Sequence, residues 1–148
     1  MWKRAILLPL VVSVAVGATA SLAASTQTAA SGRITLRGSE ILKEPHVTNG
    51  GVGGTNGRFT ITGAITDKGR LIDYRTQKGS TAWVRRVAVG KNGTITFRIT
   101  INLNTGSEPW QIVSATKSYK GLHGKGTQVV DTWYASPATF VMKGTVSQ

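Results

Sequence analysis

Apolar and polar residues alternate along most of the chain, and a period of two is typical of β-strands with one buried face. Residues 94–103, TITFRITINL, show it most clearly. The same alternation recurs at residues 33–37 and 58–66. No helical period follows the first twenty residues, so the pattern predicts an all-β domain. The expected buried face of residues 94–103 consists of Ile95, Phe97, Ile99, Ile101 and Leu103.

Turn-forming residues separate the alternating segments at regular intervals. Lys91-Asn92-Gly93 contains Asn-Gly, the strongest short hairpin signal, and Asp67-Lys68-Gly69 is a second predicted turn. About eight strands in hairpin order result, which predicts a single antiparallel barrel or sandwich with mostly up-and-down connections. An eight-stranded barrel either holds one small ligand or is filled by its own side chains, and the sequence leaves both open. The expected strands are residues 33–37, 58–66, 71–75, 82–90, 94–103, 109–115, 127–134 and 138–146.

The N-terminal residues predict export. Lys3 and Arg4 precede an apolar run from Ala5 to Val16, and the small-x-small triplet Ala18-Thr19-Ala20 follows. This is the layout of a secretory signal peptide, and the apolar run is short for a membrane span. A retained N-terminal anchor is the less favoured alternative. We therefore expect a secreted protein without a membrane span after cleavage, divided into a signal peptide (1–20), a flexible linker (21–32) and a β-barrel domain (33–148).

The chain is strongly basic and contains no cysteine. Its 18 Lys and Arg residues stand against 6 Asp and Glu residues, which gives a formal net charge of +12. Without cysteine, the exported domain is held by its core alone. The positive charge predicts either a soluble barrel with protected edges or a surface for an anionic polymer. The residues expected to contact such a polymer are Arg85, Arg86, Lys117, Lys120 and Lys125.

Residues 118–127, SYKGLHGKGT, combine glycines, lysines and a histidine. A phosphate-binding loop requires Ser or Thr after Gly-Lys and then a helix, whereas Gly126 and a predicted strand follow Lys125. A glycine-rich bend between two strands is therefore the expected structure. His46 and His123 are the only histidines, and two histidines without cysteine make a poor zinc set. No metal site and no cofactor is predicted.

Asp131 and Arg85 are the polar residues that an interior site would use. Asp131 shares a strand face with Trp133, and Arg85 shares one with Trp83. If those faces point inward, Asp131 is desolvated and needs a partner such as Arg85. If Val130 points inward instead, Asp131 faces water, and the pattern leaves both choices open. The inward choice gives a ligand cavity, with Asp131 as the weak candidate for catalysis, lined by Trp83, Arg85, Phe97, Trp110, Asp131 and Trp133.

Two segments carry a family resemblance. Residues 114–124, SATKSYKGLHG, follow a Trp-containing strand and keep only part of the motif Gly-Gly-Thr-Gly-x-Tyr-x-Gly-x-x-Gly, with Ser114 and Ala115 in place of its first two glycines. GRFTITGAITDKGRLIDY is a glycine-led strand-turn-strand. On these residues the chain resembles the allene oxide cyclase and dirigent-like barrel superfamily, especially its small secreted bacterial members. Lys117 stands where the fourth glycine of the motif is usual. The resemblance implies that the positions keeping the motif are fold determinants, namely Thr116, Tyr119, Gly121 and Gly124.

The resemblance implies a barrel and, as in relatives, a dimer or trimer. It does not carry over the activity of the plant cyclases, because their catalytic polar residues cannot be placed on this sequence. The leading prediction is a secreted barrel that binds a small apolar or aromatic molecule in its interior, without catalysis. One alternative is a cyclase or isomerase acting on a hydrophobic ligand in the barrel, with Asp131 shifting a proton. The other is a surface binder of anionic polymers through basic residues.

Overall fold

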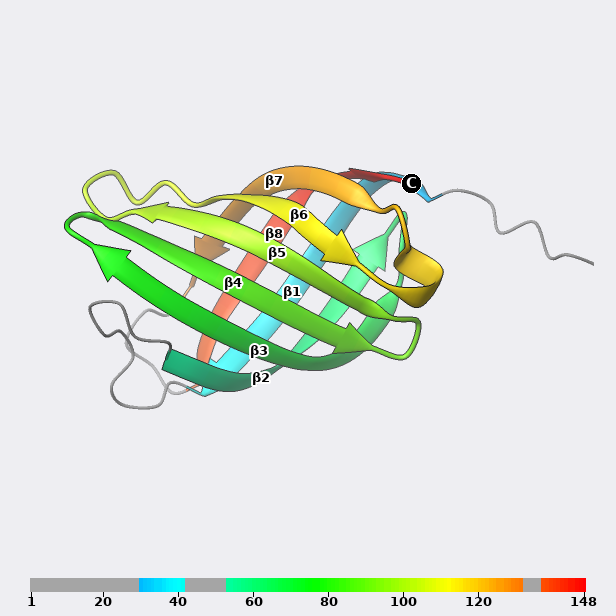
Figure 1. The fold of residues 1–148 in the computed structure, drawn as a ribbon, viewed down its shortest axis with the longest axis horizontal. Helices are drawn as coiled ribbons and strands as arrows, with labels where there is room; N and C mark the ends of the chain where they lie inside the picture. The colour runs from blue at the N-terminus through cyan, green and yellow to red at the C-terminus, as the bar shows by residue number, and fades with distance from the viewer. Residues whose placement is uncertain (1–29, 42–52, 132–136) are drawn as a thin grey trace, which may run out of the picture.

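The computed structural model describes residues 30–41, 53–131 and 137–148. Within these ranges the chain is a closed antiparallel β-barrel of eight strands, which confirms the predicted fold class (Figure 1). The predicted signal peptide lies outside the described residues, among which no helix is long and apolar enough to cross a membrane. The elements are β1 (Ser31–Ile41), β2 (Gly53–Gly63), β3 (Asp67–Lys78), β4 (Thr81–Gly90), β5 (Thr94–Asn102), β6 (Pro109–Ala115), the 3₁₀ helix η1 (Lys117–Tyr119), β7 (His123–Val130) and β8 (Ala138–Ser147).

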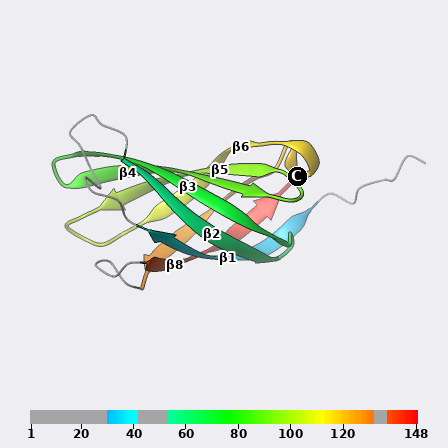
Figure 2. The same ribbon diagram turned by 90° about the horizontal axis from the view of Figure 1, so that it is seen from below.

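Strands adjacent in sequence pair with each other, and β1 closes the barrel against β8. Met142 of β8 lies opposite Leu36 of β1, and both side chains are fully buried. The view in Figure 2 places β1 and β8 along one side of the barrel and β4, β5 and β6 along the other. Closure pairs the strand edges, which is how antiparallel barrels avoid exposed edges.

Apolar side chains fill the inside of the barrel. On β5, Ile95, Phe97, Ile99 and Ile101 are at most 3 % exposed, as the alternation predicted. Leu103 does not follow the pattern, because β5 ends at Asn102 and Leu103 is exposed in the turn beyond it. The other strands add further buried side chains at the same depth. Among those that are less than 2 % exposed, the largest apolar ones are Leu36, Ile61, Leu71, Val84 and Met142, so the described interior is packed rather than hollow.

Trp110 of β6 is the largest aromatic side chain of this core. Its ring meets Phe97 edge to face with the centroids 5.5 Å apart, and its Nε1 donates a hydrogen bond of 3.0 Å to the backbone oxygen of Thr127. Glycines on β7 and β8 leave room for the indole. A Cβ atom at Gly126 would lie 2.6 Å from Cζ2 of Trp110, and one at Gly144 would lie 2.5 Å from it. The glycines of β7 and β8 therefore serve the packing of Trp110.

Asp67 ties three segments together at one end of the barrel. The turn between β2 and β3 covers residues 64–66, so the predicted turn at Asp67-Lys68-Gly69 is wrong and Asp67 begins β3. Its buried carboxylate accepts hydrogen bonds from the backbone nitrogens of Lys68, Lys91 and Asn92 and from the hydroxyl of Tyr119. The side chain thus joins the β2–β3 turn, the β4–β5 hairpin and η1.

These hydrogen bonds predict a pH-dependent stability. Burial raises the pKa of the Asp67 carboxyl, but the hydrogen bonds from Tyr119, Asn92, Lys68 and Lys91 outweigh it and hold that pKa below its usual value. The stabilisation is therefore complete above the pKa of the unfolded chain and is lost as the pH falls through the folded pKa. We expect Asp67→Asn to lower the free energy of unfolding by about 2 kcal/mol at pH 7, and by less at pH 3.

Urea unfolding at both pH values measures this difference. Asp131→Asn is the matched control, because Asp131 is exposed and surface substitutions change stability by about 0.5 kcal/mol or less. Equal stabilities of the two variants at pH 7 would show that the Asp67 carboxylate does not hold these segments together.

Candidate functional site

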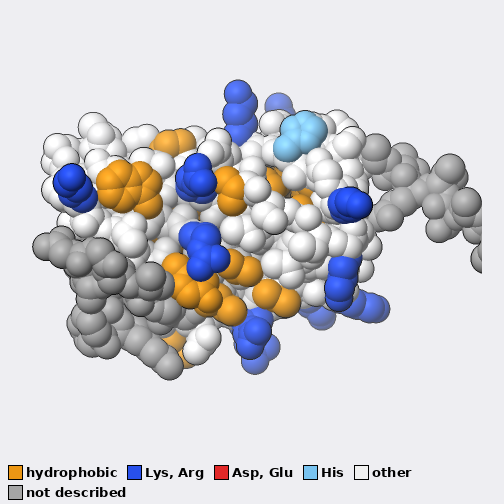
Figure 3. Space-filling view, in the orientation of Figure 1, with side chains coloured by type: hydrophobic (Ala, Val, Ile, Leu, Met, Phe, Trp, Pro, Cys, Tyr) orange, Lys and Arg blue, Asp and Glu red, His pale blue; other side chains and the backbone are white. Residues whose placement is uncertain are grey.

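Charged residues divide sharply between the two faces of the barrel. The carboxylates of Glu40, Asp67, Asp73 and Glu108 are buried, and Asp131 is the only exposed carboxylate among the described residues. On the face seen in Figure 3, blue side chains are scattered over the described part and no red ones are visible. The exposed cations of the described residues are Arg33, Arg37, Arg58, Lys68, Arg70, Lys78, Arg85, Lys91, Arg98, Lys117, Lys120, Lys125 and Lys143.

The buried carboxylate of Asp73 is paired inside the barrel with Arg86. Nε of Arg86 lies 2.9 Å from one oxygen of Asp73, and its Nη2 lies 2.6 Å from the other. Nη1 donates to the side-chain oxygen of Gln128, and the guanidinium carbon lies 3.5 Å from the ring centroid of Phe140. Asp73 and Arg86 are at most 1 % exposed. This pair is therefore a desolvated ion pair with its hydrogen bonds satisfied.

Further acids surround the ion pair and complete an internal network. Arg75 forms a salt bridge with Glu40, and Gln128 donates to Glu108. Burial, followed by the charge of Asp73, raises the pKa of Glu40. Burial also raises the pKa of Asp73, but the facing Arg86 guanidinium outweighs it, so that the Asp73 pKa is lowered. The carboxylates of this network are occupied internally and leave the outer cations uncompensated.

Four of the outer cations lie in register across the barrel, and we call them the cationic row: Arg85, Arg98, Lys125 and Arg33. Arg85 of β4 lies directly opposite Arg98 of β5. Gln111 of β6 pairs with both Arg98 and Lys125 of β7. Thr145 of β8 then pairs with both Lys125 and Arg33 of β1. With about 4.8 Å between neighbouring strands, the row spans about 24 Å of the outer surface.

The cationic row places positive side chains opposite each other, with no exposed carboxylate between them among the described residues. Like charges directly opposite each other destabilise an antiparallel pair, and nothing negative among the described residues offsets the pair of Arg85 and Arg98. The guanidinium carbon of Arg85 lies 4.2 Å from the ring centroid of Tyr74, the residue opposite it on β3. The one exposed carboxylate of the described residues, Asp131, directly follows the end of β7 and is six positions from Lys125 in sequence. A bound polyanion would relieve the repulsion.

A surface groove of about 610 Å³ follows the middle of the row. Arg98 and Lys125 lie on its two sides with Gln111 between them. The glycines that accommodate Trp110, Gly126 and Gly144, also line the groove. The Cβ positions of both glycines point toward Trp110, so the missing side chains serve the core, while the exposed side chains of Lys125 and Thr145 beside them face the groove.

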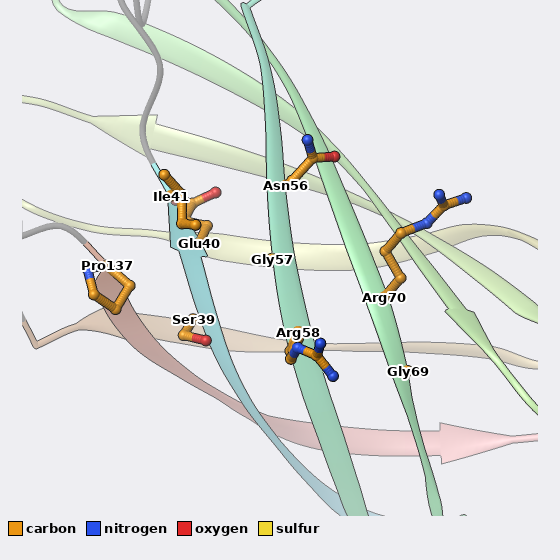
Figure 4. Close-up of a pocket in the computed structure, with 9 residues that line it drawn as sticks. All are labelled: Ser39, Glu40, Ile41, Asn56, Gly57, Arg58, Gly69, Arg70 and Pro137. Carbon is orange, nitrogen blue, oxygen red and sulfur yellow. The ribbon is translucent and has the colours of Figure 1, made fainter.

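A second groove, of about 600 Å³, crosses β1, β2 and β3 (Figure 4). Arg58 of β2 and Arg70 of β3 are directly opposite each other and form a second like-charged pair. Figure 4 shows Gly57 and Gly69 beside these arginines, on the same two strands. The groove ends at Ile41 and Pro137, which border residues outside the described part of the chain.

The residues expected to line an interior cavity do not come together. Phe97 and Trp110 pack against each other in the core, whereas Trp83, Arg85 and Asp131 are exposed. The inward orientation of Trp83 and Arg85 is therefore wrong, and the outward alternative for Asp131 is the one observed. The other face of β4, which carries Val84 and Arg86, is buried instead, because Arg86 pairs with the buried Asp73. The sixth expected residue, Trp133, lies outside the described residues.

Of the five residues expected to bind a polymer, four are exposed and one is buried. Arg85 and Lys125 belong to the cationic row, and Lys117 and Lys120 are exposed at the bend between β6 and β7. The placement of Arg86 on the surface is wrong, because its side chain pairs with Asp73 inside the barrel. Sequence reasoning missed Arg33 and Arg98, whose place in the row depends on strand register. It also missed the buried network, although Asp73 shares a face with Leu71 in an alternating segment.

Three of the four motif positions, Thr116, Tyr119 and Gly121, lie in the bend after β6, and Gly124 is on β7. The Thr116 hydroxyl accepts a hydrogen bond from the backbone nitrogen of Thr94, and Tyr119 is buried with its hydroxyl on Asp67. Gly121 has φ of 86°, and a Cβ at Gly124 would lie 2.4 Å from the backbone oxygen of Thr145. Lys117 has φ of 53°, a conformation that favours glycine.

The histidines do not form a metal site in the described residues. The ring of His123 is exposed, and its Nε2 lies 2.8 Å from the Ser147 hydroxyl. No cluster of three or more His, Cys, Asp or Glu side chains suited to a metal ion occurs in the described ranges. His46 lies outside them.

Comparison with known proteins does not show a family for this chain. No family model matches the chain, and neither the curated proteins nor the solved structures contain a significant match to it. The resemblance to the allene oxide cyclase and dirigent-like superfamily therefore stays a prediction, and the proposal of a function depends on the geometry and on the sequence.

Proposed function

We propose that this chain binds anionic polymers on the outside of its barrel, through the cationic row. The observation that carries the proposal is the register of Arg85, Arg98, Lys125 and Arg33, which lines up four exposed cations over five steps between strands. Phosphate, sulfate or carboxylate groups of a polymer would meet these cations in succession. The signal-like residues 1–20 support placing this activity outside the cell.

The two interior functions predicted from sequence have less support. Phe97 and Trp110 are core residues, and the described interior is filled by apolar side chains and by the Arg86 network. Asp131, the candidate proton carrier, is exposed on the outer face. The pocket that Asp131 lines, of about 350 Å³, also contains Arg37 and Arg58 and opens on the outside of the barrel, away from the interior site expected from the sequence.

Removing two charges from the row tests the proposal. We expect Arg85→Gln/Arg98→Gln to weaken binding of inorganic polyphosphate about tenfold at low salt. The slope of log K against log salt should become shallower by about 1.4, if each cation releases about 0.7 counterions as on a single strand. Isothermal titration calorimetry at several salt concentrations measures both quantities.

Arg37→Gln/Arg70→Gln is the matched control, because both arginines are exposed and lie outside the row. It removes the same charge and the same residue type. If the proposal is right, the control retains most of the affinity. Equal losses in the two double variants would mean that net charge, rather than the row, attracts the polymer, and the proposal would be wrong.

A further inference from the structure

An exposed indole lies beside the cationic row. Trp83 of β4 is 39 % exposed and shares the outer face with Arg85, two positions along the strand. Two residues of a strand span about 6.7 Å. The residues directly opposite Trp83 are Thr76 on β3 and Thr100 on β5, both small and polar. The indole is therefore held at the surface between short neighbours, next to cations.

Arg85 supplies a second planar group. Its guanidinium carbon lies 4.2 Å from the centroid of the Tyr74 ring, which is a cation–π contact. A guanidinium held over an aromatic ring is restrained, and a guanidinium plane also stacks on nucleobases. Trp83 and Arg85 thus present two groups suited to flat π systems at one end of the row, and Arg98, Lys125 and Arg33 continue it with positive charge.

We propose that the polymer bound by the cationic row is a single-stranded nucleic acid, whose bases stack on Trp83 and on the Arg85 guanidinium while its phosphates follow Arg98 and Lys125. This inference rests on the proposed function and names its polymer. Single-strand binding characteristically combines a basic track with exposed aromatic groups. Polyphosphate has no π face, and the bases of a duplex are stacked on each other, so neither makes use of Trp83.

The test compares two polymers on one set of variants. The probes are a fluorescein-labelled oligothymidine of twelve nucleotides, followed by anisotropy, and inorganic polyphosphate as its unlabelled competitor and direct ligand. We expect Trp83→Ala to weaken oligothymidine binding about 5- to 150-fold, the range for loss of one stacked base. Trp83→Phe should recover most of that loss. Polyphosphate affinity should stay within about twofold of the parent chain, because the cations are intact.

Val129→Ala is the control for loss of an exposed apolar side chain, since Val129 is 63 % exposed on β7. It should bind both polymers like the parent. The single-strand inference is overturned if Trp83→Ala binds oligothymidine normally, if it loses both polymers equally, or if a duplex of the same length binds as tightly as the single strand. In each of those cases the parent still binds polyanions, whereas a parent that binds none of them contradicts the proposed function itself.

Discussion

Arg86→Met is expected to lower the free energy of unfolding by about 3–5 kcal/mol, because it leaves the buried carboxylate of Asp73 without its counter-charge. Gln128 loses its Nη1 donor at the same time. Methionine keeps an unbranched apolar side chain of similar length against Phe140, so the loss reports mainly on charge and hydrogen bonding. Urea unfolding at pH 7 measures it.

Two further variants identify the cause. Arg98→Met makes the same substitution on the outer face of the barrel, where we expect a change of about 0.5 kcal/mol or less. Arg86→Met/Asp73→Asn removes both charges of the buried pair and should be more stable than Arg86→Met alone, since no isolated charge stays in the core. If Arg86→Met is as stable as Arg98→Met, the internal ion pair does not hold the barrel.

Trp110→Ala is expected to cost a similar amount, about 3–5 kcal/mol. The substitution removes the edge-to-face contact with Phe97 and the hydrogen bond from Nε1 to Thr127, and it empties the space that Gly126 and Gly144 keep free. The strands around this space are closed into a barrel, so they cannot collapse freely to fill it. Thermal and urea unfolding measure the loss.

Gly144→Ala tests the packing of Trp110 by adding an atom next to the indole instead of removing the indole. Its new Cβ would lie 2.5 Å from Cζ2 of Trp110 and 2.2 Å from the backbone oxygen of Lys125, so we expect clear destabilisation. Trp83→Ala is the control, because that indole is partly exposed on the outer face and its loss leaves no buried cavity. A Trp110→Ala chain as stable as Trp83→Ala would contradict the assignment of Trp110 to the core.

The alternation of apolar and polar residues was sufficient to predict the barrel, and it failed at particular strands for physical reasons. On β5 one face is apolar and the other polar, so the buried face is unambiguous. On β4, Val84 and Ala88 compete with Trp83 and Val87 for the interior, and the pattern cannot decide between them. The face of β4 that points inward is the one with Arg86, because Arg86 pairs with the buried Asp73 on β3. This contact joins two strands, so the sequence pattern of β4 alone could not predict it.

The cationic row could not be predicted from the sequence, because it depends on the register in which neighbouring strands pair. A shift of one residue moves a side chain to the other face of a sheet. The first hairpin turns at residues 64–66 rather than at Asp67-Lys68-Gly69, and the β5–β6 pairing shifts register between Thr96 and Phe97. Arg33 and Lys125 are far apart in sequence and become neighbours only when β8 pairs with both β1 and β7.

The salt dependence of binding to an oligothymidine tests the central claim most directly. Each cation that contacts a single strand contributes about 0.7 to the slope of log K against log salt, so the four cations of the row give a slope of about −2.8. Between 50 and 200 mM salt, we therefore expect binding to weaken about 50-fold. An affinity that does not change over this range, or no binding of either oligothymidine or polyphosphate at 50 mM salt, would contradict the assignment of the outer surface to anionic polymers.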